Sequence, residues 1–311
     1  MDHFKRIALY GHRGWASSAI ANSLIAAGGP VSVLHRATSD TSALPAGTPT
    51  CEIDLKNRKS IQDALKDIDI LISLVGHQNV NHQLALISAL PHIDVRLFVP
   101  SDLAHKMTQE QMLIPNLRAK AEVEQAARDA GISTTVVRPG SLVESTFSTP
   151  LVGVDIQGNR IVHTGGSAHQ SLNLCSRQYV AAAYAAIFAR TPIAQLNGRA
   201  IGLREFICTG SEIPAALQRR HGVPPKVYHH SLEQAKQEIE IRMRNGDLCA
   251  LAFSYRYPRG AGKQVELVGD HVWELQGYKK KTLEEVTVKG RMEPYKEFPP
   301  VLAAALETTF F

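Results

Sequence analysis

The glycine-rich segment near the start of the chain has the residues to hold a phosphate group. Gly11 and Gly14 follow a short apolar strand pattern, and a helical pattern with Trp15 in its first turn begins there. Glycine lets the backbone approach a ligand, and a helix N-terminus offers unpaired N–H donors and a dipole that favours negative charge. This layout predicts a site for the pyrophosphate of a dinucleotide. Ser17 stands where the fingerprint of such sites has a third glycine, so we expect slightly less close helix–strand packing.

Two arginines near this turn indicate which dinucleotide is bound. Arg36 directly follows the second apolar strand pattern, where an acidic side chain would favour the ribose hydroxyls of NAD. The first acid after that strand, Asp40, comes too late for this role. A guanidinium pairs with the 2′-phosphate of NADP instead. The sequence therefore predicts NADPH or NADP as the cofactor. Arg13, inside the glycine turn, either adds a phosphate contact or faces solvent.

Lys120 is the candidate for proton transfer. None of the eight tyrosines has a lysine four residues later, so the Tyr-x-x-x-Lys pair of many short-chain reductases is absent. Lys120 lies in the helical pattern before the sixth strand, a helix that flanks the nicotinamide in such folds. Desolvation there would disfavour the charged ammonium and make the group a better general acid. The alternative is a solvated surface lysine.

The elements that must position these residues alternate regularly along the first half of the chain. Strand patterns lie at residues 7–10, 31–35, 50–53, 71–75, 97–100 and 134–138, and helical patterns at 14–27, 60–66, 80–90 and 115–130. Such β-α alternation predicts an α/β fold with a doubly wound parallel Rossmann sheet. Ligands of these sheets bind outside the carboxyl ends of the strands. The candidates that follow the later strands are Gly76, His77, Ser101, Pro139, Gly140 and Ser141.

The pattern becomes less regular after residue 145. We expect residues 1–145 to form an NADP-binding domain and residues 146–311 a smaller, irregular substrate-binding region. A helix near residues 177–189 is expected to pack back on the first domain. Ser231 and Gln234 form a capping box for another helix, and its apolar stripe of Leu232, Ala235, Ile239 and Met243 favours core or pocket wall over a partner site.

Composition excludes several classes of protein. The 311 residues carry a net charge of +5 that is spread along the chain, which argues against nucleic-acid binding. The four cysteines are far apart and read as reduced thiols, which favours a cytoplasmic protein. The longest apolar run is too short to span a bilayer, and the 13 histidines show no metal-ligand spacing. We therefore expect no membrane association and no metal.

Several segments resemble one family. They are residues 69–78, Gln83, residues 96–102 and residues 120–132, with weaker likeness at residues 273–277 and 281–286. Together they resemble the isoflavone reductase and phenylcoumaran benzylic ether reductase group of the NmrA-like atypical short-chain dehydrogenases/reductases. The resemblance covers most of residues 5–145 and is patchy beyond.

The resemblance implies NADPH as hydride donor, with Arg36 at the adenosine phosphate and Lys120 in proton transfer. His77 would contact the cofactor, with a second acid–base role near the substrate as the alternative. Pro139, Gly140, Ser141 and Leu142 would line the inner end of the pocket, with Phe147 as a wall. The chain departs from the family at His12-Arg13, at Ser17, and at residues 101–104, where an aromatic near the nicotinamide is lost.

We therefore predict an NADPH-dependent reductase of a small, mostly apolar metabolite of secondary metabolism, aromatic or polyketide-like. Two alternatives remain open from the sequence. One is a redox-sensing regulator of the NmrA type that binds NADP(H) without catalysis. The other is an isomerase, dehydratase or cyclase that kept the cofactor site for a redox-neutral step. The expected partner is a small-molecule substrate, and a homodimer is compatible with the sequence.

Overall fold

The computed structural model describes residues 5–269, 271–296 and 298–311. The chain forms two compact units, and each is built from more than one stretch of sequence. The first runs to Asp102 and also contains Asn116–Val137 and Val180–Ile201. The second contains Leu103–Pro115, Arg138–Tyr179 and Gly202–Phe311. The single boundary expected near residue 145 stays a prediction.

The first unit is built around a parallel sheet. Its strands are β1 (Ile7–Tyr10), β2 (Val31–His35), β3 (Thr50–Glu52), β4 (Ile70–Ser73) and β5 (Leu97–Val99). Their order is β3-β2-β1-β4-β5, and every neighbouring pair is parallel. Phe98 forms a parallel bridge with Thr134, just before β6 (Thr135–Arg138). The predicted Rossmann-type α/β fold is therefore confirmed.

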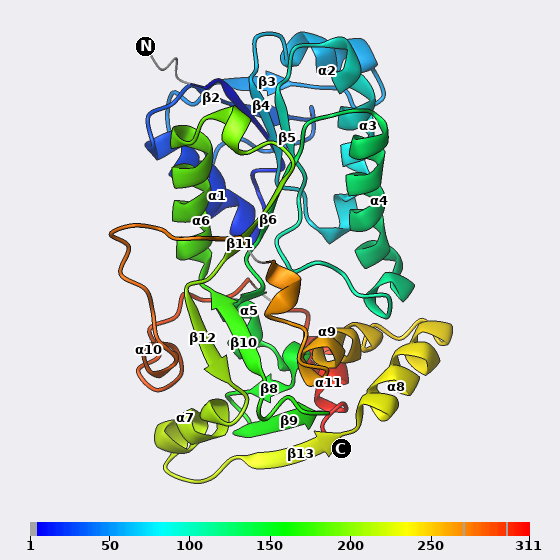
Figure 1. Cartoon of the computed structure of the whole chain (residues 1–311), viewed down its shortest axis with the longest axis vertical. Coiled ribbons are helices and arrows are strands. Elements are labelled where there is room, and N and C mark those ends of the chain that lie inside the picture. The colour runs from blue at the N-terminus through cyan, green and yellow to red at the C-terminus, as the bar shows by residue number, and fades with distance from the viewer. Residues whose placement is uncertain (1–4, 270, 297) are drawn as a thin grey trace. The chain divides into compact units, whose positions relative to one another are not determined.

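Helices cover both faces of this sheet, with α1 and α6 on one side and α3 and α4 on the other (Figure 1). Their bounds are α1 (Trp15–Ala26), α2 (Arg58–Ala64), α3 (His82–Ala89), α4 (Pro115–Asp129) and α6 (Arg177–Ala185). The alternation of strand side chains explains the two layers. Ala8 and Tyr10 of β1 pack with Ile61, Leu86 and Val123 of the covering helices in one buried apolar cluster. After Ala185 the expected helix continues as a π-helix, Ala186–Arg190.

The second unit contains more strands than the sequence pattern indicated. They are β7 (Ser141–Leu142), β8 (Val154–Asp155), β9 (Arg160–Thr164), β10 (Ser171–Cys175), β12 (Phe206–Thr209), β13 (Lys226–His230) and β14 (Val272–Trp273). Two of its sheets have the orders β12-β10-β7 and β13-β9-β8, and β14 pairs with the end of β11 (Arg199–Leu203). The longer of these strands match those of the first unit in length, but they do not alternate regularly with helices, so the pattern that marks a doubly wound sheet is absent from this part of the sequence.

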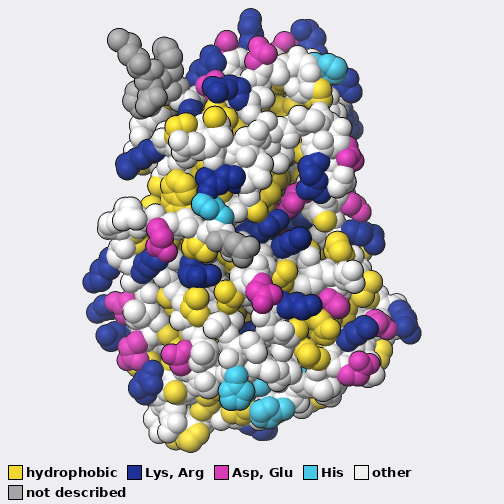
Figure 2. Space-filling view, viewed as in Figure 1, with side chains coloured by type: hydrophobic (Ala, Val, Ile, Leu, Met, Phe, Trp, Pro, Cys, Tyr) yellow, Lys and Arg dark blue, Asp and Glu magenta, His cyan; other side chains and the backbone are white. Residues whose placement is uncertain are grey.

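The helices of the second unit are α5 (Val143–Ser148), α7 (Glu212–His221), α8 (Leu232–Arg244), α9 (Ala250–Gly260), α10 (Leu283–Thr287) and α11 (Pro300–Glu307). The capping box expected at the start of α8 is present, with both of its hydrogen bonds. Ala235 and Ile239 of the apolar stripe are buried against Phe253 of α9, with Met243 packed at the edge. The stripe is therefore core. On the face seen in Figure 2, basic and acidic side chains are interspersed.

A buried carboxylate holds the start of α6. The Glu144 side chain is fully buried, and both of its oxygens accept from the backbone N–H of Arg177, at 3.2 and 3.1 Å. Burial raises the pKa of Glu144 to about 7, against the effect of these hydrogen bonds and of Lys281. Since the ordinary value is near 4.5, the ionised form of this group opposes folding at neutral and alkaline pH.

This burial predicts an unusual pH dependence of stability. With the folded-state pKa raised, the contribution of Glu144 is fully present below about pH 4.5 and is lost as the pH rises through about 7. We expect Glu144→Gln to gain roughly 2–3 kcal/mol relative to wild type between pH 5 and pH 8, in urea unfolding. Glu212→Gln is the matched control. Thr209 lowers the pKa of that exposed carboxyl, so the control should show no such gain. Equal changes in both variants would contradict the prediction.

Candidate functional site

Gly11 sits against the backbone of the neighbouring strand's end. It has a φ of +99°, and a Cβ atom there would lie 2.7 Å from Val75 N and 2.8 Å from Leu74 C. Only glycine fits such a position without moving backbone. The close approach lets the chain leave β1 and turn at once into α1.

Two serine hydroxyls donate hydrogen bonds to the backbone carbonyls of Leu74 and Val75. Ser17 Oγ, on the first turns of α1, donates a 2.6 Å hydrogen bond to Leu74 O. Ser101 Oγ, just after β5, donates a 2.7 Å hydrogen bond to Val75 O, and its backbone N–H donates to Gln83 Oε1. Ser17 therefore ties the helix to β4 by a hydrogen bond. The slightly less close packing expected from its replacing a glycine stays a prediction.

The N-terminus of α1 presents its backbone donors without a capping side chain. Gly14 is the N-cap residue, has no side-chain cap hydrogen bond, and is exposed. The first turn contains no acidic residue, and half-buried Trp15 begins the helix. An anion at this end would meet unpaired N–H groups and the positive end of the helix dipole.

Arg13 and Arg36 both lie near the side chain of Tyr10. Both guanidiniums act electrostatically on Tyr10, where burial raises the pKa of the phenol and the two arginines oppose the rise. Arg36 also lies near His82, whose ring accepts or donates a 3.2 Å hydrogen bond with Tyr10 Oη. Neither arginine forms an ion pair within the described residues. The structure thus brings together two cations beyond the ends of β1 and β2.

Lys120 is buried and paired with an acid. Its Nζ lies 3.4 Å from Asp102 Oδ1, and the two side chains are only 8% and 5% exposed. Its burial places Lys120 in the desolvated environment that the sequence predicted, and its role in proton transfer stays a prediction. Asp102 directly follows Ser101 at the end of a strand, but the sequence did not indicate that it pairs with Lys120.

A tyrosine hydroxyl adds to this buried pair. Tyr184 of α6 is fully buried, and its Oη has no hydrogen-bond partner within the part of the chain that the structure describes. Burial raises the pKa of Tyr184, and the charge of Asp102 raises it further, so the phenol stays protonated. Tyr184 therefore lies within the electrostatic influence of Asp102 but forms no hydrogen bond with it. No local pattern in the sequence links Tyr184 to this place.

The remaining candidates of the first unit lie at the expected strand end. Gly76 caps a short 3₁₀ turn after β4, which begins with His77, and both residues are exposed. A Cβ atom at Gly76 would meet nothing within 4 Å, so its glycine is not required by the fold. That open space is compatible with a ligand passing close to the backbone.

The other candidates belong to the second unit. Gly140 has a φ of +75°, and a Cβ there would lie 2.6 Å from Asn173 Nδ2, which donates to Pro139 O. Ser141 and Leu142 form β7 and pair with β10. Phe147 is buried in the apolar core of this unit. The roles of these residues toward substrate and cofactor stay predictions.

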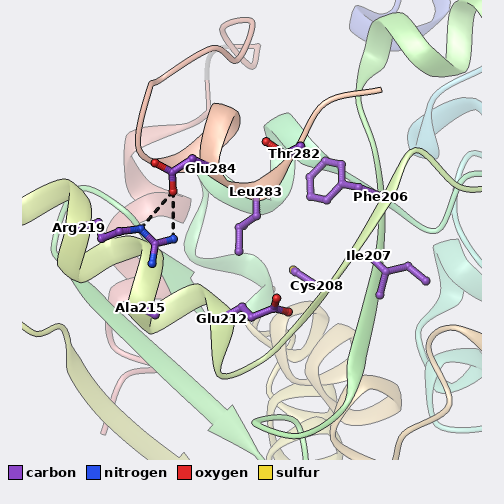
Figure 3. Close-up of a pocket in the computed structure, with 9 residues that line it drawn as sticks. All are labelled: Phe206, Ile207, Cys208, Glu212, Ala215, Arg219, Thr282, Leu283 and Glu284. Atoms are coloured by element: carbon purple, nitrogen blue, oxygen red, sulfur yellow. Dashed lines mark hydrogen bonds and ion pairs between the residues drawn. The ribbon is translucent and has the colours of Figure 1, made fainter. Parts of the chain in front are cut away.

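A solvent-open pocket of about 420 Å³ lies within the second unit (Figure 3). Phe206, Ile207 and Leu283 supply apolar wall, and the Cys208 thiol lies at its inner side. An ion pair between Arg219 and Glu284 crosses one side, with Nη2 and Oε2 3.0 Å apart. None of its lining residues was a candidate from the sequence.

The described residues contain neither a metal-ligand cluster nor a helix able to span a membrane. Residues 5–269, 271–296 and 298–311 contain no cluster of three His, Cys, Asp or Glu side chains able to hold a metal ion. In the same residues, no helix combines the length and apolar character that crossing a bilayer requires.

The sequence as a whole matches one protein family. A model of the NmrA-like family aligns with residues 3–285. The chain belongs to the NmrA-like family. The resemblance carried by residues 69–78, 96–102 and 120–132 is confirmed.

Curated relatives are similar over part of their length. The phenylcoumaran benzylic ether reductase 1 of Arabidopsis thaliana is 28% identical over 152 residues, which cover 44% of this chain and 49% of that protein. The bifunctional pinoresinol-lariciresinol reductase 2 of Thuja plicata is 25% identical over 183 residues, 52% of this chain and 56% of that protein. The chain thus spans about half the length of the curated relatives it matches.

Solved structures share the fold over nearly the whole chain. A complex of leucoanthocyanidin reductase with NADPH from Vitis vinifera superposes with a TM-score of 0.73 at 15% identity, covering 91% of this chain and 98% of that one. An isoflavone reductase gives a TM-score of 0.71 at 18% identity, covering 92% and 99%. At these identities the likeness establishes the fold.

The close approach at Gly11 predicts a large loss of stability on substitution. Gly11→Ala would force a Cβ into the backbone of Leu74 and Val75 at a positive φ, so we expect a loss of about 3 kcal/mol or more in urea unfolding. Gly28→Ala is the control, because Gly28 has a φ of +79° but open space around its Cβ position. It should lose only about 1 kcal/mol. Equal losses would mean that the backbone contact is unimportant.

Proposed function

We propose that this protein is an NADPH-dependent reductase of a small, mostly apolar substrate. The observation that carries the proposal is the buried pair of Lys120 and Asp102, beyond the end of β5 in the sheet that bears the glycine turn. A charged donor held at this edge suits proton transfer to an oxygen at the nicotinamide end of such a fold. The names of the relatives, which are reductases, support the same class of reaction.

The residues of the first unit fit the cofactor. Gly11 allows the sharp turn out of β1, since a side chain there would meet the backbone of Leu74 and Val75, and the uncapped start of α1 that follows offers backbone donors to a pyrophosphate. Arg36, with Arg13 beside Tyr10, supplies positive charge for the 2′-phosphate that distinguishes NADPH from NADH. When bound, NADPH supplies a hydride for an electrophilic carbon of the substrate.

Lys120 completes the reduction from the protein side. Its Nζ donates a proton, or a full hydrogen bond, to the oxygen of a conjugated carbonyl or benzylic ether as that oxygen gains electrons. Asp102 is a positioning residue that holds the ammonium in place at 3.4 Å. The lysine regains its proton from solvent, so each turnover consumes one hydride and one proton.

The cofactor preference should depend on the two arginines. We expect Arg36→Ala to weaken NADPH binding by about 10–100-fold, since a hydrogen bond between charged groups contributes roughly 1.5–3 kcal/mol. NADH binding should change little. Arg13→Ala should weaken NADPH about 10-fold if its guanidinium reaches a phosphate. Isothermal titration calorimetry with both nucleotides measures this selectivity.

Arg128→Ala serves as the matched control for these variants. Arg128 is an exposed arginine of α4 that pairs with Glu124 and Gln125. It is not among the residues proposed to bind a phosphate. It should bind both nucleotides as wild type does. An Arg36→Ala protein with unchanged preference for NADPH would refute the assignment of Arg36. An unchanged dissociation constant for Arg13→Ala would show that this side chain faces solvent.

Turnover should depend on the buried pair. Against a panel of conjugated carbonyls, imines and benzylic ethers, Lys120→Ala should lower kcat by about 10²–10⁴-fold without changing the Kd of NADPH. Asp102→Asn should lower kcat less and shift its pH profile, because the ammonium loses its stabilising charge. The loss of the reduced nicotinamide's absorbance at roughly 340 nm measures NADPH oxidation and records both effects.

Two results would point to the alternatives. Tight binding of NADPH with no oxidation across the panel favours a redox-sensing regulator, and product formation without NADPH consumption favours a redox-neutral step. Full activity of Lys120→Ala with bound cofactor would leave the reductase class intact but remove Lys120 from the mechanism.

A further inference from the structure

Arg259, at the end of α9 in the second unit, is a buried cation without a counterion. The residue is 2% exposed, and its Nε, Nη1 and Nη2 atoms have no hydrogen-bond partner among the described residues. Burial lowers the pKa of Arg259, and no described carboxylate acts on it. A guanidinium has five N–H donors, so this position leaves a strong and directional donor set unused.

Arg256, one turn earlier on the same helix, shows what a buried arginine requires. Its Nη1 donates to Thr309 O at 3.2 Å, and its Nη2 donates to Pro150 O at 2.7 Å and to Thr309 Oγ1 at 2.8 Å. Its guanidinium also lies over the rings of Phe253 and Phe310. Backbone carbonyls, a threonine hydroxyl and aromatic faces thus pair the two terminal nitrogens of Arg256, and only its Nε has no hydrogen-bond partner among the described residues. Arg259 has no hydrogen-bond partner at any of its three nitrogens in the same residues, which favours a partner that is a bound ligand.

The groups near Arg259 suit an anion. His163 of β9 is buried and acts electrostatically on it, and burial together with the Arg259 charge lowers the pKa of this imidazole to about 4. The neighbouring Thr164 carries another buried oxygen, Oγ1, that has no partner in the described part of the chain. Its backbone O lies 2.5 Å from where a Cβ of Gly260 would be, so β9 and the end of α9 are in close contact. His163 also lies beside His229, with ring centroids 5.8 Å apart. Figure 2 shows histidine side chains gathered at the surface near β9 and β13.

We propose that Arg259 is the centre of a second ligand site, which binds an oxyanion group, a carboxylate or a phosphate, inside the second unit. The planar fork of a guanidinium matches both groups in a two-point hydrogen bond. This site is independent of the nicotinamide cofactor and of the proposed reduction.

The pocket of Figure 3 lies beside Cys208, a residue close to the proposed site. Cys208 lines the pocket, and its buried thiol interacts electrostatically with Arg259, so a ligand that enters from this side would have to pass Cys208. The apolar walls of Phe206, Ile207 and Leu283 suit the carbon body of an acidic metabolite. Glu212, the acid in the pocket, is exposed and held by Thr209 N and Oγ1, so solvent and salt screen its repulsion.

The test measures the melting temperature of the full chain with sodium phosphate, sodium benzoate or sodium chloride at equal ionic strength. A ligand that binds only the folded state raises Tm in a saturable way, by roughly 5 °C at an anion concentration about 100-fold above its Kd. We expect this rise with phosphate or benzoate and not with chloride. The anion that gives the stronger response identifies phosphate or carboxylate as the natural head group.

Three variants make the result specific. Arg259→Met keeps the side-chain length and should lose the response. Arg36→Ala removes the proposed phosphate contact of the cofactor site but should keep the rise of Tm with the oxyanion. This variant separates the present proposal from the one on NADPH. Arg219→Gln, at the exposed ion pair of the pocket, should also keep this rise of Tm.

A direct measurement covers the case in which Arg259→Met does not fold. Wild-type crystals soaked in sodium selenate should show an anomalous peak within hydrogen-bond distance of the Arg259 guanidinium. Selenate peaks elsewhere with none at Arg259 would overturn the proposal. So would an equal rise of Tm in wild type and in Arg259→Met, or no saturable rise with either oxyanion.

Discussion

The contact between Gly11 and the backbone of Leu74 and Val75 is the constraint on which the first unit depends. It brings the end of β1 so close to the end of β4 that no side chain fits between them. The carbonyls of the same two residues then accept hydrogen bonds from Ser17 and Ser101. One short stretch of backbone thereby fixes the start of α1 and the end of β5. Asp102 follows Ser101 directly, so its position beside Lys120 depends on the same contact.

The first unit could largely be predicted from the sequence, because its signals are local. β1 and β2 have the expected bounds, and α4 begins at Pro115 as expected. Gly11 and Arg36 were found because a turn glycine and a strand-end charge lie next to the elements that explain them. Pairing of Asp102 with Lys120, and the position of Tyr184, depend on side chains that meet only after helices pack on the sheet. The strands of the second unit were missed because they do not alternate regularly with helices along the chain, although several are as long as those of the first unit.

Buried charges are handled differently in different parts of the molecule. Lys120 and Asp102 neutralise one another at 3.4 Å. Glu144 is held by a helix N-terminus, and burial still raises its pKa to about 7. Arg256 is satisfied by carbonyl oxygens and aromatic rings. Each of these charges is costly to bury, and each is retained together with a partner that reduces the cost. Arg259 stands apart from this series because its compensation is not part of the chain.

The interleaving of the two units along the chain has a consequence for biosynthesis. The polypeptide passes between the units after residues 102, 115, 137, 179 and 201. Since the first unit needs Val180–Ile201, it cannot be complete until the ribosome has made that segment. The early strands must wait, partly unprotected, for a segment made much later. A chain cut in the middle would therefore lack part of the first unit as well as the rest of the second.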